Sequence, residues 1–142
     1  MPSFWPMQLH FKTYCDKSNL QSVRDFLRKS LNDNGVSEPD AYMTVLAVDE
    51  ICSNLMIHSN CCNNTMEIDL DLAFRQNQLQ IIISDSGISF KFENHTDNSL
   101  QTLVDDKRKG GLGLTLVKRI MDEVSYHSEC GRNSWTLCKK FA

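Results

Sequence analysis

Residues 65–84, TMEIDLDLAFRQNQLQIIIS, decide the fold class because they carry the pattern of a β-hairpin. In the first half, apolar and polar residues alternate with the two-residue period of a strand that buries one face, the apolar positions being Met66, Ile68, Leu70 and Leu72. A polar turn at 75–78 separates this strand from an Ile-rich strand at 79–84. The sequence therefore predicts an antiparallel sheet that needs a second layer to cover its apolar face.

Three helical patterns can supply that layer. The first begins at Asn19, repeats apolar residues every three or four positions and ends at Asn34-Gly35. The second covers about 37–58, and because ten of the sixteen residues from position 43 onward are apolar, it is predicted to be mostly buried. The third follows the glycine-rich run at 110–113, with apolar residues at Leu114, Leu116, Val117, Ile120 and Met121.

A short opening strand and a closing hairpin complete the pattern. Residues 11–14 are predicted to form the opening strand, and 123–129 and 134–140 to form the hairpin around a turn at 130–133. The resulting order predicts an α+β fold, a two-layer sandwich with helices on one face of a mainly antiparallel sheet. The chain is expected to be a single domain spanning residues 1–142.

The amino-acid composition argues against several classes of function. The 142 residues include 15 Lys and Arg against 18 Asp and Glu, and the one dense basic run is 107–109, so a direct nucleic-acid partner is not expected. No apolar run is long enough to cross a bilayer, and residues 1–6 lack the pattern of a secretory signal. The six cysteines include no C-x-x-C pair, which favours reduced thiols in the cytoplasm over a zinc site.

The first candidate site is a polar stripe in the second helix. Glu50, Asn54 and His58 are spaced by four residues and therefore lie on one helical face. They are either ordinary solvated positions or the lining of a polar cavity. In the second case Glu50 would act as a general base and the Asn54 amide oxygen would bind Mg²⁺, whereas His58 is expected to be a packing residue.

The second candidate is Asp85-Ser86-Gly87, at the end of the Ile-rich strand. This tripeptide is a turn signature. A carboxylate carried by a buried strand can also accept a hydrogen bond from the exocyclic amine of a base, and Gly87 would let the backbone approach that base closely.

The third candidate is the glycine-rich run at 110–113, which opens a helix after a long polar loop. Exposed N–H groups at such a helix start bind anions, and basic residues lie just upstream at 107–109, although a flexible hinge is the alternative. The run fits neither the P-loop nor the G-x-G-x-x-G pattern, so a phosphate site here would be of another kind.

Together the three candidates resemble the N, G1 and G2 boxes of the GHKL (histidine-kinase-like) ATPases, as E-x-x-x-N at 50–54, D-x-G-x-x-F at 85–90 and G-G-L-G-L at 110–114. The likeness extends from Leu20 to Lys140 and looks most like the anti-sigma-factor serine/threonine kinase subfamily, in the segments 47–54, 110–114, 121–124, 131–133 and 136–137. It implies the Bergerat fold, in which ATP lies between the long helix and the sheet under a mobile lid, here about 91–109.

The resemblance implies a role for each matching nucleotide-binding residue. Asp85 would bind the adenine amine, with Gly87 beside it and Thr136 on the last strand supporting the base. Lys107 would face a phosphate where relatives often carry Arg, and a point charge there replaces the planar guanidinium. The phosphates would be wrapped by Gly110, Gly111, Leu112, Gly113 and Leu114.

The same resemblance implies the reaction and the partners. Asn54 would hold Mg²⁺, and Glu50 would activate a serine or threonine hydroxyl of another protein. The expected function is an ATP-dependent regulator in the cytoplasm that sequesters a sigma factor or similar partner and phosphorylates a small antagonist protein. The alternative is a non-catalytic partner switch governed by ATP or ADP. Family members commonly dimerise through the sheet side, so Trp5, Phe11 and Trp135 are candidates either for a homodimer contact or for the core.

Overall fold

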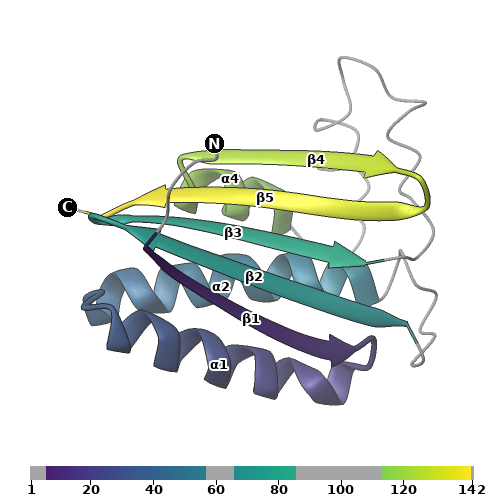
Figure 1. The fold of residues 1–142 in the computed structure, drawn as a ribbon, viewed down its shortest axis with the longest axis horizontal. Coiled ribbons are helices and arrows are strands. Elements are labelled where there is room, and N and C mark those ends of the chain that lie inside the picture. The colour runs from purple at the N-terminus through teal and green to yellow at the C-terminus, as the bar shows by residue number, and fades with distance from the viewer. Residues whose placement is uncertain (1–5, 57–65, 86–112, 142) are drawn as a thin grey trace.

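The computed structural model describes residues 6–56, 66–85 and 113–141. Within these ranges one antiparallel sheet has the strand order β1-β2-β3-β5-β4, and three α-helices cover one of its faces (Figure 1). The predicted α+β two-layer sandwich is confirmed. Its elements are β1 (Met7–Tyr14), a 3₁₀ helix (Lys17–Asn19), α1 (Leu20–Asp33), α2 (Glu38–Asn54), β2 (Glu67–Arg75), β3 (Gln78–Asp85), α4 (Gly113–Ile120), β4 (Glu123–Glu129) and β5 (Arg132–Lys140).

The helices follow the sequence pattern closely. Gly35, at φ 78°, ends α1 with its N–H donating to the Asn32 carbonyl and the Val36 N–H donating to Leu31, which is a Schellman-type stop. As an α-helix, α2 ends at Asn54, earlier than the predicted limit near His58, which lies outside the described residues. None of the helices in the described ranges is long and apolar enough to span a membrane.

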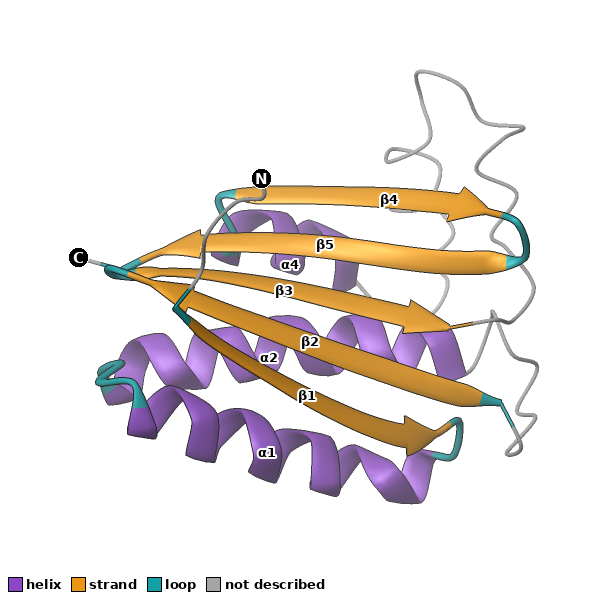
Figure 2. Ribbon diagram, viewed as in Figure 1, coloured by secondary structure: helices purple, strands orange, loops and turns teal. Residues whose placement is uncertain are grey.

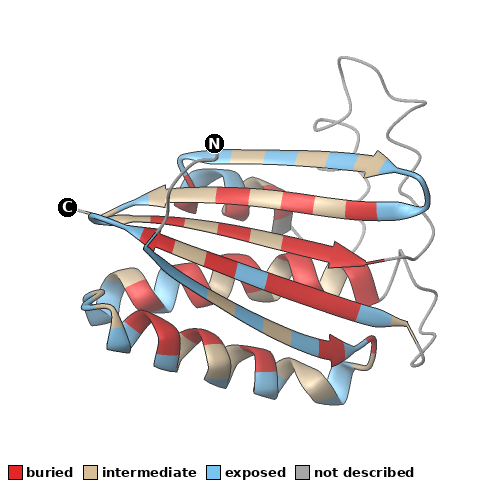
Figure 3. Cartoon of the chain, viewed as in Figure 1, coloured by how far each residue is buried: buried red, intermediate tan, exposed pale blue. Residues whose placement is uncertain are grey.

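The core lies between the helices and one face of the sheet, and buried residues alternate along the central strands (Figure 3). Leu70, Ile83 and Trp135 are paired across β2, β3 and β5, and all three are fully buried. The Phe11 ring stacks on Phe26 of α1 at a centroid distance of 4.8 Å. Trp135 is therefore a core residue and Phe11 is a half-buried residue packed against the core, whereas Trp5 lies outside the described residues.

The opposite face of the sheet is open and carries charge. Asp69 of β2 accepts a hydrogen bond from Arg132 of β5 at 2.8 Å and lies 3.2 Å from His10 of β1. Lys12 and Glu67 form a further pair beside this group at 3.3 Å. These polar side chains explain why this face needs no covering layer within the described chain.

Both hairpin turns are shorter than predicted. Only Gln76 and Asn77, at φ 34° and 62°, connect β2 to β3, and only Cys130 and Gly131, at φ 53° and 77°, connect β4 to β5. Positive φ at both central residues is the mark of a two-residue type I′ turn, whose twist matches that of the strands. The predicted turn at 130–133 is therefore wrong in extent, and Asn133 belongs to β5.

Candidate functional site

The ends of two elements bring predicted site residues to one end of the molecule (Figure 2). The helix α2 finishes there with Asn54, and the strand β3 finishes there with Asp85. The helix α4, which packs against α2, starts on the same side with Gly113. Segments that are remote in sequence thus meet where the resemblance expects a nucleotide.

Asp85 is a buried carboxylate on the helix-covered face of the sheet. It continues the alternation of Leu79, Ile81 and Ile83, and its exposed fraction is 0%. Across the ladder it faces Asn133 of β5, whose Nδ2 donates to Asp85 Oδ1 at 2.9 Å. A buried carboxylate needs such donors, because burial without them is costly.

Asn133 is itself held by two hydroxyl groups from the edge strand β4. Its Oδ1 accepts from Ser128 Oγ at 2.8 Å and from Tyr126 Oη at 3.1 Å. The result is a hydrogen-bonded network that runs from β4 through β5 to the carboxylate at the end of β3.

The structure does not bring Thr136 to Asp85. Thr136 is paired with Ile82 on one side and Ser125 on the other. Because successive strand residues point to opposite faces, the Thr136 side chain lies on the open face, away from Asp85. On β5 the hydrogen bond to Asp85 comes from Asn133.

Sequence reasoning missed Asn133 because it was counted as a turn residue. The available signal was Cys130-Gly131, since a glycine at the second position of a two-residue turn is typical of type I′ hairpins. Starting β5 at Arg132 would have placed Asn133 opposite Asp85 in the ladder.

Glu50 and Asn54 are half-buried near the end of α2. The preceding residue, Asp49, accepts a hydrogen bond from Arg24 of α1 at 2.8 Å, which identifies the flank of α2 that faces α1. Each residue rotates about 100° around a helix, so Glu50 is turned away from α1. Asn54 lies one turn further along the same stripe, toward the flank on which α4 packs.

The surroundings of this stripe are acidic. Burial raises the pKa of the Cys52 thiol well above its ordinary value, and the negative charges of Asp49 and Asp85 raise it further. Cys52 is therefore a neutral core residue. Any phosphate bound close to these carboxylates would need a cation to offset the charge.

Several predicted residues lie outside the described ranges, namely Gly87, Lys107, Gly110, Gly111 and Leu112, together with the lid at 91–109. Of the glycine-rich run, the structure describes Gly113 as the first residue of α4 and Leu114 as a core residue with an exposed fraction of 5%. Leu114 therefore anchors the start of α4 with its side chain packed in the core.

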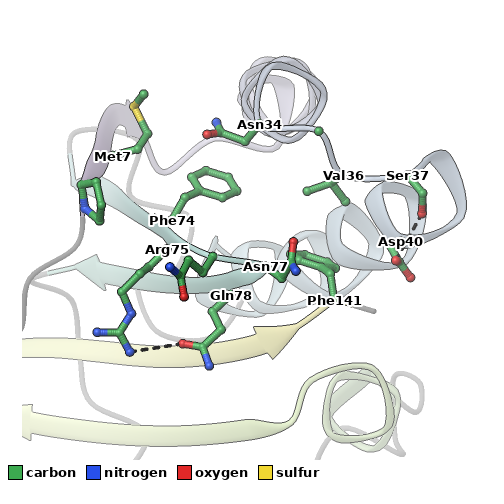
Figure 4. A pocket seen from close by; sticks show the side chains of 13 residues that line it. Met7, Asn34, Val36, Ser37, Asp40, Phe74, Arg75, Asn77, Gln78 and Phe141 are labelled. Carbon is green, nitrogen blue, oxygen red and sulfur yellow. Dashed lines mark hydrogen bonds between the residues drawn. The ribbon is translucent and has the colours of Figure 1, made fainter.

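A cavity of about 570 Å³ lies at the other end of the molecule (Figure 4). Its lining includes Val36, Phe74 and Phe141. Gln78, the first residue of β3, also lines it, whereas Asp85 is the last residue of that strand. This cavity contains none of the predicted site residues.

The two-layer arrangement of helices over an antiparallel sheet is the α+β fold of the histidine-kinase-like ATPase domains. The chain belongs to the histidine kinase-like ATPase domain family, whose sequence pattern matches residues 15–139. Among curated proteins it is similar to serine-protein kinase RsbW of Bacillus licheniformis, with 32% identity over 102 residues that cover 68% of this chain and 63% of that protein. Serine-protein kinase RsbW of Staphylococcus aureus is 31% identical over 102 residues, covering 68% of this chain and 64% of that protein. The chain thus spans less than two thirds of the length of these relatives.

Two solved structures share the fold. The RsbU and RsbW domains of a Mycobacterium tuberculosis protein align with a TM-score of 0.68 and 17% identity, covering 94% of this chain and 32% of that one. The SiaB-SiaC complex from Pseudomonas aeruginosa aligns with a TM-score of 0.58 and 15% identity, covering 92% of this chain and 88% of that one.

Proposed function

We propose that this chain is a protein serine/threonine kinase of the anti-sigma type, which binds ATP with Mg²⁺ and transfers its terminal phosphoryl group to a small antagonist protein. The observation that carries this proposal is the buried carboxylate of Asp85 at the end of β3, beside the end of α2 that bears Glu50 and Asn54. Membership of an ATPase-domain family supports the nucleotide, and the named activity of the RsbW relatives supports the phosphoryl transfer.

The carboxylate of Asp85 is a suitable hydrogen-bond acceptor for an adenine ring. The exocyclic amine of adenine is a donor, and an ionised carboxylate is purely an acceptor with about four lone-pair sites. Asn133 uses one of these sites, on Oδ1. The position of Asp85 on the helix-covered face would orient the base between the sheet and α2, with Gly87 beside it.

The stripe on α2 fits a metal and a reacting hydroxyl. Mg²⁺ prefers oxygen ligands, keeps several waters and takes further ligands from phosphates, so the single amide oxygen of Asn54 suffices as the protein ligand. Bound ATP would supply the phosphoryl group, and Mg²⁺ would offset the negative charge of the phosphates. Glu50, one helical turn before Asn54, would accept the proton of the attacking serine or threonine hydroxyl. Lys107 and the backbone of 110–114 would hold the phosphates.

We infer the protein partners from the similarity to the RsbW relatives, and not from a particular surface of this chain. We expect the phosphate acceptor to be a small antagonist protein and the sequestered partner to be a sigma factor or an equivalent regulator, in the cytoplasm. A homodimer contact would not use Trp135, because its side chain is fully buried in the core.

Phosphate incorporation into the antagonist protein tests the proposal. With labelled ATP and Mg²⁺ the parent chain should phosphorylate the antagonist, and Glu50→Gln should abolish transfer while ADP still binds. Glu38→Gln, an exposed position at the start of α2, is the matched control and should transfer normally. ADP binding without transfer by the parent chain would instead favour the non-catalytic partner switch.

A further inference from the structure

The network around Asn133 has a fixed direction. An ionised Asp85 can only accept hydrogen bonds, so the group of Asn133 that faces it must be the NH₂ donor. The amide oxygen then points the other way, where the hydroxyls of Ser128 and Tyr126 both donate to it. The carboxylate therefore sets the orientation of the amide, and the two hydroxyls donate to the oxygen that this orientation turns toward them.

This direction matters because the amide could otherwise turn over. Rotating the Asn133 amide by 180° would place its oxygen against the Asp85 carboxylate, and two acceptors would repel each other. The two hydroxyls from β4 do not select the orientation, because a hydroxyl can accept as well as donate, but their hydrogen bonds fix where the amide lies. The exposed fraction of Asn133 is 1%, so water does not readily replace these contacts.

We propose that Asn133 is a positioning residue for adenine recognition: its amide holds the Asp85 carboxylate in place as the acceptor for the amine of the base, and Ser128 and Tyr126 hold Asn133 from β4. The inference rests on the proposed nucleotide site and adds to it how this chain selects adenine. It keeps Asp85 as the selecting group and gives the supporting role on β5 to Asn133, itself held from β4, in place of the Thr136 hydroxyl.

Comparison of two nucleotides isolates this role. ADP carries the 6-amino group, whereas purine riboside 5′-diphosphate is the same nucleotide without it. Hydrogen bonds to charged groups contribute enough that the parent chain should prefer ADP by about tenfold or more. Asn133→Ala should remove about tenfold of this preference, while affinity for the analogue changes by less than about threefold.

Because Asn133→Ala could disturb folding, a second variant tests the same role while the Asn133 side chain is kept. Tyr126→Phe combined with Ser128→Ala keeps the Asn133 side chain but removes two hydrogen bonds that hold its amide in place, so the double variant should also lose most of the preference. Each single variant should lose less, because one hydroxyl still holds the amide oxygen. Thr136→Val on the open face of β5 and Ser125→Ala on the open face of β4 are the matched controls and should keep the parent preference.

The outcomes separate the two proposals. A parent chain that binds neither nucleotide would overturn the proposed function itself. A parent chain that prefers ADP, with Asn133→Ala and the double variant equally selective, would overturn the role of Asn133 and leave the proposed function standing. Equal losses for ADP and the analogue would make Asn133 purely structural, which also overturns the inference.

Discussion

Replacing Trp135 by alanine should destabilise the domain more than any other single change on β5, because this side chain fills the core beneath the Asp85 network. Trp135 has an exposed fraction of 0% and packs its ring against Tyr126 at a centroid distance of 4.9 Å. Burial of about 150–250 Å² at about 25 cal/mol per Å² gives roughly 4–6 kcal/mol. Retention of the Cβ and partial collapse reduce this to about 3–5 kcal/mol.

Urea unfolding followed by circular dichroism measures this change without depending on tryptophan emission. A loss of about 4 kcal/mol corresponds to a fall in melting temperature of roughly 8–16 °C for a chain of this size. Thr136→Ala is the matched control, since the neighbouring residue points to the open face and should cost about 1 kcal/mol or less. A loss below about 1 kcal/mol for Trp135→Ala, or an equal loss for Thr136→Ala, would refute this account of the core.

Three further predictions use other described residues. Gly35→Ala should cost about 1–2 kcal/mol in urea unfolding, because alanine is strained at φ 78°, and an unchanged midpoint would argue against the helix stop seen here. Iodoacetamide should label the exposed Cys130 but not the buried Cys52, whose pKa is raised by burial and by Asp49 and Asp85, and native-state labelling of Cys52 in peptide mass spectra would contradict its packing. Hydrogen bonds from the Ser18 N–H and hydroxyl hold the pKa of Asp16 below its ordinary value of 3.8, so its ionised form stabilises the fold above that pH and this contribution is lost as the pH falls. The melting temperature of Asp16→Asn should therefore lie below that of the parent at pH 7 and approach it below about pH 3.8, and a pH-independent difference would exclude this cause.

Much of the fold could be predicted because its signals are local and repeated. The alternation from Met66 to Leu72 and the helical period after Asn19 each specify one face of one element. The glycine at position 35 marks the end of α1 because few other residues adopt its backbone conformation. Helix ends and strand pairs of this kind need no knowledge of distant contacts.

The site was predicted less completely because it depends on register between strands. Asp85 and the stripe of Glu50 and Asn54 could be found from spacing, but the partner of Asp85 depends on where β5 begins. A two-residue difference in the turn before β5 decides whether Asn133 lies in the turn or in the ladder. The alternation of Trp135, Thr136 and Leu137 places Thr136 on the face opposite the apolar residues, but it does not show which residue of β5 lies across from Asp85.

Calorimetric titration of the purified chain with ADP in the presence of Mg²⁺ tests the central claim, that Asp85 is the adenine-recognising group of a nucleotide site. The parent chain should bind with one-to-one stoichiometry, and Asp85→Asn should weaken binding by about tenfold or more while the melting temperature shows that the variant remains folded. Equal affinity of the parent and a folded Asp85→Asn variant, or no binding by the parent, would contradict the claim.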